Sequence, residues 1–184
     1  MNPNVTTKEE ILAKCREIAQ SQGLKAVTIR NVAKELDVAV GSLYNYFPSK
    51  DDLMLETVTS CWHNVFHFEG AAFDRKDFLS VLRYFDSSLE KGMKTYPGFF
   101  SLHAFSFADN EKGKGEERMQ EVFTHMKAMM KATLDDDPKV RPDAFKDLDE
   151  NKFIDMVFLT VVHARFAGFA DENTFVTMIS RVIY

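Results

Sequence analysis

Apolar residues recur at helical spacing along most of the chain. Thr7 and Glu10 form a capping-box pattern, and a stripe of apolar positions follows it up to Gly23, which suits a helix C-terminus. Thr28 is a suitable N-cap for a second stripe, Ile29–Leu36, with apolar residues at i, i+3, i+4 and i+7. The pattern predicts two helices, of which the second is short.

A third short helix is predicted from Ala39 to Phe47, because Pro48 cannot continue it. Asp37 lies in the connection between the second and third helices. Aspartate tolerates the left-handed backbone that a tight turn requires. Ser49 and Asp52 then repeat the capping pattern and open a longer fourth helix.

The remaining sequence continues in the same manner, and strand patterns are nearly absent. The fourth helix is predicted to cover 49–68. Further helices are predicted at 77–95, 97–107, 117–134 and 151–170, with a last one from 171 or 172 to the end. Charged or proline-containing connections lie at 109–117 and 135–149. The prediction is an all-α fold of about nine helices.

Composition favours two parts with different roles. Residues 1–50 contain seven basic and five acidic side chains, whereas the other 134 residues contain 16 basic and 23 acidic ones. Phe47 is the only phenylalanine among the first 50 residues, out of 17 in the chain. Any polyanion would therefore bind to the N-terminal part. We predict an N-terminal domain at 1–49 and a larger one at 50–184.

The sequence favours a cytoplasmic protein. It contains no apolar run long enough to span a membrane and no apolar segment near its start that resembles a signal peptide. Cys15 and Cys61 are far apart and show no ligand spacing, which favours reduced thiols in the cytoplasm over a disulfide.

Two short helices joined by a tight turn are typical of a helix-turn-helix, whose second helix enters the major groove of DNA. Helix pairs of this kind also occur in ordinary helical cores. The third helix favours DNA, because Gly41 leaves room for close approach and Ser42, Tyr44 and Asn45 offer polar groups. Lys50 adds a positive charge in the first turn of the next helix.

The segment T-x-R-x-V-A-x-x-L-x-V-x-x-G-S-L-Y-x-Y-F-x-S-K-x-x-L, within Lys8–Leu55, resembles the DNA-binding domain of TetR-type transcriptional regulators. The resemblance implies an all-α homodimer, a palindromic operator in double-stranded DNA and a pocket for a small-molecule effector. Matching positions give the expected DNA-binding residues: Thr28, Arg30, Val40, Gly41, Ser42, Tyr44, Asn45, Tyr46 and Lys50.

Two positions depart from the family pattern. Asp37 stands where the turn usually has glycine, and Val40 stands where lysine is common. Val40 either contacts a thymine methyl group or packs in the core, since Leu43, Tyr44 and Phe47 share its helical face.

Aromatic residues are concentrated between 62 and 126, which predicts either a small-molecule pocket or a plain core. The candidate ligand-binding residues are Trp62, Phe66, Phe85, Tyr96, Phe99, Phe100, His103, Phe123 and Met126. His63 and His67 have i, i+4 spacing, but no carboxylate or cysteine completes a metal site, and we predict none. No cofactor is predicted.

The last two predicted helices are apolar on more than one face, which favours a dimer interface over a monomer that buries all of these residues internally. The candidate interface residues are Ile154, Val157, Phe158, Val161, Ala164, Phe175, Ile179 and Val182.

These patterns and the resemblance together predict a ligand-responsive repressor that binds DNA as a homodimer and is released by an apolar or aromatic small molecule. The alternative is a DNA-binding scaffold whose C-terminal domain binds a protein partner. An enzyme is not predicted, because the sequence contains neither a phosphate-binding glycine loop nor a nucleophile elbow.

Overall fold

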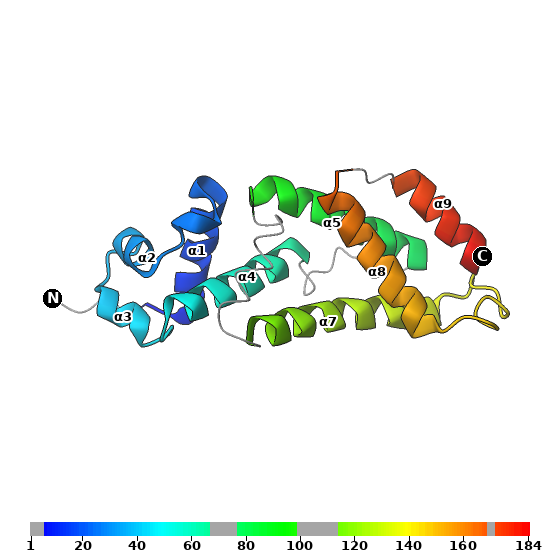
Figure 1. Cartoon of the computed structure of the whole chain (residues 1–184), viewed down its shortest axis with the longest axis horizontal. Coiled ribbons are helices and arrows are strands. Elements are labelled where there is room, and N and C mark those ends of the chain that lie inside the picture. The colour runs from blue at the N-terminus through cyan, green and yellow to red at the C-terminus, as the bar shows by residue number, and fades with distance from the viewer. Residues whose placement is uncertain (1–5, 67–76, 99–113, 169–171) are drawn as a thin grey trace. The chain divides into compact units, whose positions relative to one another are not determined.

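The computed structural model describes residues 6–66, 77–98, 114–168 and 172–184, and every regular element in these ranges is helical (Figure 1). The elements are α1 (Lys8–Gln22), η1 (Leu24–Ala26), α2 (Ile29–Glu35), α3 (Val40–Tyr44), α4 (Lys50–Phe66), α5 (Phe78–Thr95), α7 (Lys114–Asp136), α8 (Glu150–Phe166) and α9 (Glu172–Ile183). The predicted all-α fold is confirmed.

The chain forms two compact units. The first unit contains residues 1–65 and 92–120, and the second contains residues 66–91 and 121–184. These units do not coincide with the predicted division at residues 49 and 50, because most of α4 packs with the helices before it. The division at residue 50 concerns function and stays a prediction.

The predicted caps define the helices of the first unit. Thr7 and Glu10 form a complete capping box: the Thr7 hydroxyl accepts from the Glu10 N–H, and the Glu10 carboxylate accepts from the Thr7 N–H at 2.7 Å. Gly23 ends α1 with a positive φ of 82°. Thr28 caps α2 by accepting from the Asn31 N–H at 3.2 Å. All three predictions are confirmed.

The connection between α2 and α3 is tight, as predicted. The Val38 N–H donates to the Ala33 carbonyl at 3.0 Å, and Asp37 has a φ of 54°. This φ lies in the left-handed region, where a side chain carries a steric cost that glycine avoids.

Asp37→Gly should therefore stabilise the first unit by up to about 1 kcal/mol, net of the extra backbone entropy that glycine has when unfolded. Denaturant unfolding followed by circular dichroism measures the change. Asp51→Gly, at an exposed position in the first turn of α4, is the matched control and should destabilise the protein by about 1 kcal/mol. Loss of stability in Asp37→Gly would show that the aspartate side chain contributes more than its backbone conformation costs.

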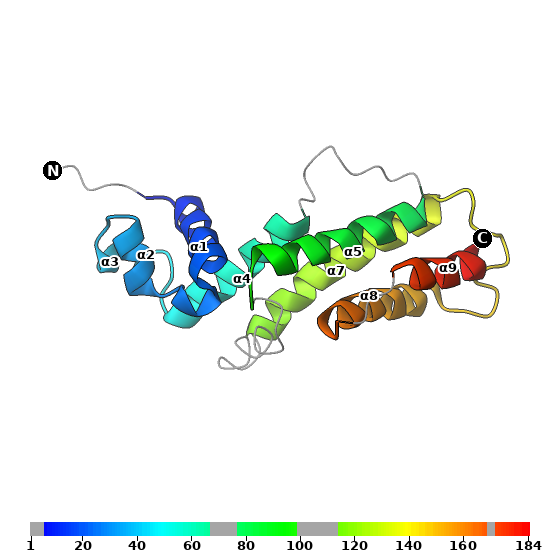
Figure 2. The same ribbon diagram turned by 90° about the horizontal axis from the view of Figure 1, so that it is seen from above.

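The first unit contains α1, α2, α3 and most of α4 (Figure 2). Its core includes apolar residues with at most 2% exposure, among them Ile11, Cys15, Ile18, Val32, Leu43, Phe47, Leu53 and Cys61. At its edge, the Lys8 ammonium lies 3.2 Å from the Glu56 carboxylate and 5.8 Å from the centre of the Phe47 ring. The core fixes α3, because Leu43 and Phe47 are its anchors on that segment.

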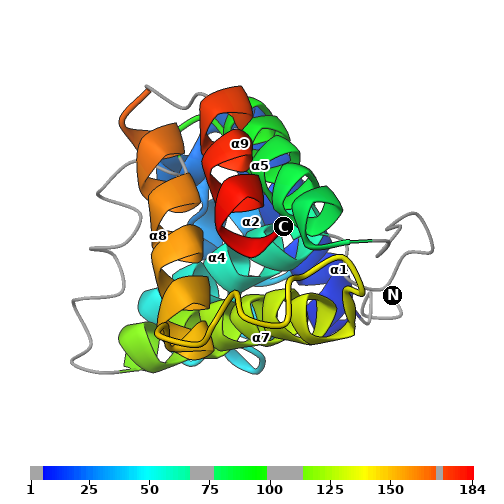
Figure 3. The ribbon, with the colours of Figure 1, turned by 90° about the vertical axis from the view of Figure 1, so that its right-hand side faces the viewer.

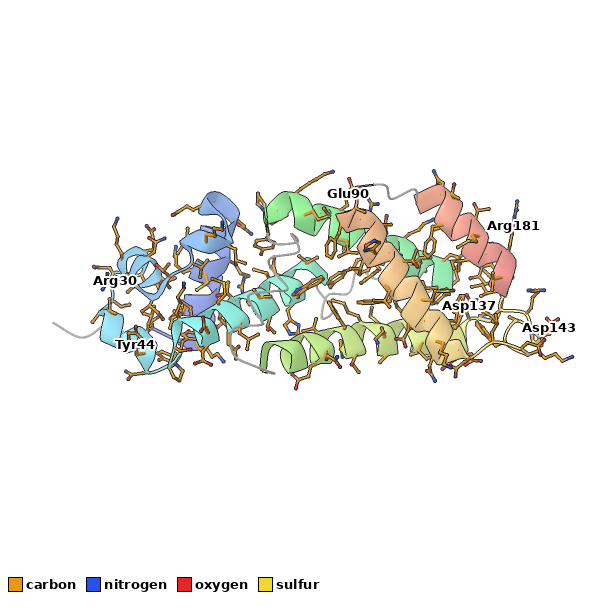
Figure 4. All side chains as sticks on the ribbon, in the orientation of Figure 1. Arg30, Tyr44, Glu90, Asp137, Asp143 and Arg181 are labelled. Atoms are coloured by element: carbon orange, nitrogen blue, oxygen red, sulfur yellow. The ribbon has the colours of Figure 1, made fainter. Side chains whose placement is uncertain are left out.

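In the second unit, α8 and α9 are neighbours (Figures 2 and 3). The buried Asp137 carboxylate accepts from the Phe78 N–H at 2.8 Å and from the Tyr184 hydroxyl at 2.5 Å. The Arg141 N–H donates to the Ile183 carbonyl at 2.8 Å. These bonds connect the start of α5, the loop after α7 and the end of α9, and Figure 4 labels Asp137 at this junction.

The observed helices differ from the predicted ones mainly at their ends. The helix α3 is shorter than predicted and consists of Val40–Tyr44, while Ser49 and Asp52 cap α4 as predicted. The helix predicted at 97–107 lies largely outside the described residues.

Candidate functional site

The outward side of α2 and α3 carries the residues predicted to bind DNA. Val40, Tyr44 and Tyr46 are 40%, 50% and 38% exposed, and Arg30, Gly41, Asn45 and Lys50 are also exposed. Thr28 and Ser42 are partly exposed. Figure 4 places Arg30 on α2 and Tyr44 on α3. None of these nine residues is buried in the core.

This exposure separates the two interpretations of α3. Leu43 on α3 and Phe47, three residues after its end, are 0% and 1% exposed, whereas Val40 and Tyr44 on α3 are 40% and 50% exposed. Val40 is therefore not a core residue. The buried pair fixes the position of the helix, and the exposed pair is available to a partner.

Hydrogen bonds within the chain limit what two of these hydroxyl groups can offer. The Thr28 hydroxyl accepts from the Asn31 N–H, so its proton is still available for a phosphate oxygen. The Tyr46 hydroxyl donates its one proton to the Thr6 carbonyl at 2.5 Å. Tyr46 thus ties the segment before α1 to the residues that follow α3, and its role in DNA binding stays a prediction.

Lys34 is a basic residue of this surface that the sequence analysis missed. It is exposed on α2, one helical turn after Arg30. Residues four apart lie on the same side of a helix, so the spacing could have identified it. Arg30, Lys34 and Lys50 are exposed positive charges on α2 and at the start of α4.

The candidate ligand residues are packed side chains where the structure describes them. In the first unit, Trp62 and Tyr96 are 2% and 1% exposed. The Tyr96 hydroxyl donates to the Asn64 side-chain oxygen at 2.9 Å, and burial raises the pKa of Tyr96 above its ordinary value. The hydroxyl of Tyr96 therefore already has a hydrogen-bond partner within the protein.

The two thiols of the first unit are also inert in this arrangement. Burial raises the pKa of Cys15 to about 11 and that of Cys61 to about 12. Both are free, as predicted, and protonated thiols are poor nucleophiles and poor metal ligands.

In the second unit, the candidate ligand residues lie in a series of ring contacts. Phe66 stacks on Phe85 at 5.0 Å between centroids, and Phe158 lies 5.2 Å from both Phe85 and Phe123. Met126 is fully buried. Phe99, Phe100 and His103 lie outside the described residues. The candidate ligand-binding residues that the structure describes are therefore packed against one another in the core, and the ligand pocket stays a prediction.

The candidate interface residues divide into two groups. Ile154, Val157, Phe158, Val161 and Ile179 are buried within the single chain, with exposures of 4% or less. Ala164, Phe175 and Val182 are partly exposed. The large apolar residues exposed on α8 and α9 are instead Met156 at 56%, Leu159 at 61% and Met178 at 50%. The sequence analysis predicted helices that are apolar on more than one face, but it did not name these three residues, and five of the eight residues that it named are buried within the chain.

Within the described ranges, no three metal-binding side chains are grouped as a metal site would require. His63 is exposed on α4, and His67 lies outside these ranges. None of the helices described is both long and apolar enough to cross a membrane.

The fold and the exposed helix pair define a helix-turn-helix protein with a helical C-terminal part. Residues 11–57 match the family model described as bacterial regulatory proteins, tetR family. The repressor KstR of Mycolicibacterium smegmatis is 45% identical over 51 residues, which cover 28% of this chain and 25% of KstR. The chain thus aligns with only about a quarter of the length of the KstR repressors.

Two comparisons extend beyond this segment. The nucleoid occlusion factor SlmA of Vibrio cholerae is 26% identical over 155 residues, covering 82% of this chain and 77% of SlmA. The crystal structure of a TetR transcriptional regulator from Legionella pneumophila has a TM-score of 0.60 at 17% identity, covering 98% of this chain and all of that one. The latter likeness concerns the fold alone.

Residues 11–57 therefore match the DNA-binding segment of the TetR family of transcriptional regulators, and the fold of the chain is similar to that of a solved TetR regulator. Regulators of this family are transcription factors and not enzymes, in agreement with the sequence prediction.

Proposed function

We propose that this protein is a cytoplasmic, ligand-controlled repressor that binds a palindromic DNA operator as a homodimer and leaves it when an apolar or aromatic small molecule binds. The observation that carries the proposal is the exposed surface of α2 and α3, within the segment that matches the TetR family model. KstR, which is similar over this segment, is named a transcriptional repressor.

The DNA contacts follow from the side chains on this surface. The guanidinium of Arg30 is suited to guanine or phosphate, and Ser42 and Asn45 are suited to base edges or sugar-phosphate oxygens. Lys34, Lys50 and the Tyr44 hydroxyl contact phosphates. A few basic residues per protomer give a moderate salt dependence, with a log–log slope of roughly −5 for a dimer that neutralises about six phosphates.

The homodimer is proposed to form through the outer face of α8 and α9, which presents Met156, Leu159 and Met178. A two-fold axis presents the same patch on both protomers, so one apolar face is sufficient. The dimer spaces two α3 helices for successive major grooves.

Effector binding acts by favouring the protomer arrangement that fits DNA poorly. A small molecule shifts this equilibrium only by its differential affinity for the two states. An affinity ratio of roughly 100 between the states corresponds to about 2.7 kcal/mol. The aromatic residues between 62 and 126 favour an apolar or aromatic effector.

A second candidate is a DNA-binding scaffold whose C-terminal domain binds a protein. Two observations favour it: the described aromatic residues are packed against one another, and SlmA, similar over most of the chain, is named a nucleoid occlusion factor.

The test is a mobility-shift assay with DNA flanking the gene, across a salt series, using wild type, Arg30→Ala and Tyr44→Ala. We expect specific binding that each variant weakens by at least about tenfold, because each loses a contact to base or backbone. Arg83→Ala, an exposed arginine of α5 in the second unit, is the control and should bind like wild type.

Aromatic compounds added to the preformed complex then separate the two candidates, because only the first predicts release by a small molecule. Binding that is equal for all sequences and for all three variants would rule out the operator-binding proposal.

A further inference from the structure

We infer that Val40, beside the ring of Tyr44, reads the 5-methyl group of a thymine in each half-site of the operator. This inference rests on the proposed function and specifies what the DNA-binding surface recognises. Its basis is the exposure of an apolar pair on a helix whose other apolar residues are buried.

Val40 lies outside the core of the first unit. It is 40% exposed, while Leu43 on the same helix is 0% exposed and anchors the helix to the core. At 40% exposure, part of the Val40 side chain stays in water in the folded protein. That part contributes favourable free energy when a partner removes it from water.

Val40 belongs to a small exposed patch on and beside α3. Tyr44 follows at i+4, so its ring lies on the same side of α3, and it is 50% exposed. Figure 4 labels Tyr44 on this helix. Ala39 and Gly41 are also exposed and add no hydrogen-bonding side chain. The patch is therefore small, apolar and bordered by the polar Ser42 and Asn45.

The major groove of DNA contains a group that matches this patch. The major groove of DNA presents one apolar group, the thymine 5-methyl, and small apolar side chains recognise it. Guanine presents two acceptors and cytosine an amino donor, and Val40 can satisfy neither. Val40 therefore selects an A·T pair at the position that it faces, whereas Arg30 and Asn45 supply the polar contacts at other positions.

The experiment uses the full-length protein and an operator obtained by selection from random duplex DNA. Single thymines in each half-site are replaced by deoxyuridine, which removes only the methyl group. We expect one position per half-site at which binding weakens about fourfold, and about 15-fold when both half-sites are changed, from the burial of one methyl-sized group each.

Val40→Ala should bind the thymine operator more weakly and lose this sensitivity to deoxyuridine. Arg30→Ala should bind more weakly but keep it. Placing 5-methylcytosine instead of cytosine at the sensitive position should partly restore wild-type binding, because the methyl group occupies the same place in the groove. Thermal unfolding of Val40→Ala should match that of wild type, since Val40 is exposed.

Sequence-specific binding without a deoxyuridine-sensitive position, or equal sensitivity in wild type and Val40→Ala, would overturn the inference while the proposed function stands. Failure of the selection to enrich any sequence would overturn the proposed function and this inference with it.

Discussion

Leu159→Glu should convert the protein to monomers and weaken its binding to the operator by at least about 100-fold. Leu159 is 61% exposed on α8, with Met156 one turn before it at 56%. The spacing of three or four residues makes an apolar seam on a helix surface. A seam of this kind, uncovered in the single chain, is typical of a surface that another helix covers.

The size of the effect comes from the symmetry of a homodimer. In a two-fold interface each substitution occurs twice, and a residue near the axis faces its own copy. Two glutamates would lose hydration and repel each other, at a cost of several kcal/mol. A monomer then reaches only one half-site and loses the gain of roughly 100-fold or more that linked binding provides.

Sedimentation velocity measures the oligomeric state, and the mobility-shift assay measures operator affinity in the same samples. Leu148→Glu is a matched control, because Leu148 is 51% exposed in the loop before α8 and the substitution adds the same charge. It should leave both measurements unchanged. A Leu159→Glu protein that remains dimeric and binds the operator normally would exclude this face from the interface.

The sequence pattern of α8 predicted a helix but not which of its faces packs inside the chain. The periodicity of the segment 151–170 identified two apolar faces and therefore a helix with neighbours on both sides. It did not identify which face meets the rest of the same chain. Ile154 and Met156 are equally apolar in sequence, but the first is 2% exposed and the second 56%.

Local patterns were the most informative. Thr7, Thr28, Ser49 and Asp37 each have the cap or turn conformation predicted for them, because these interactions depend on residues at most a few positions away. The residues predicted to bind DNA are exposed or partly exposed. Their exposure was predictable because it depends on two short neighbouring helices and the turn between them.

Interactions between distant residues were not predictable. The Tyr46 hydroxyl donates to the carbonyl of Thr6, 40 residues away, and no local pattern predicted this bond. Asp137 joins Phe78, 59 residues away, and Tyr184, 47 residues away. No spacing rule connects such residues, because their proximity is a product of the fold.

Arg165→Ala should destabilise the second unit by about 3 kcal/mol. This is the largest effect on stability that we expect from the loss of a single ion pair in this unit. The Arg165 guanidinium donates twice to the Asp86 carboxylate, from Nε at 2.5 Å and from Nη2. Its Nη1 lies 3.5 Å from the Glu90 carboxylate, and Figure 4 labels Glu90 on α5. This interaction fixes α8 against α5.

The cost comes from the carboxylate that is left behind. The side chain of Asp86 is 7% exposed and that of Arg165 17% exposed, so solvent screens the pair only weakly. Removing the arginine leaves a buried charge without its counter-ion, and this penalty exceeds the net value of the pair. The Glu90 contact adds little, because that side chain is 45% exposed.

A double-mutant cycle with Asp86→Ala measures the interaction by denaturant unfolding. Asp86→Ala alone should also be destabilising, whereas the double variant should be far less so than the sum of the two. Arg83→Ala, an exposed arginine on the same helix as Asp86, should change stability by no more than about 1 kcal/mol. Additive effects in the cycle would mean that the pair does not couple α5 to α8, and that the two side chains act through packing alone.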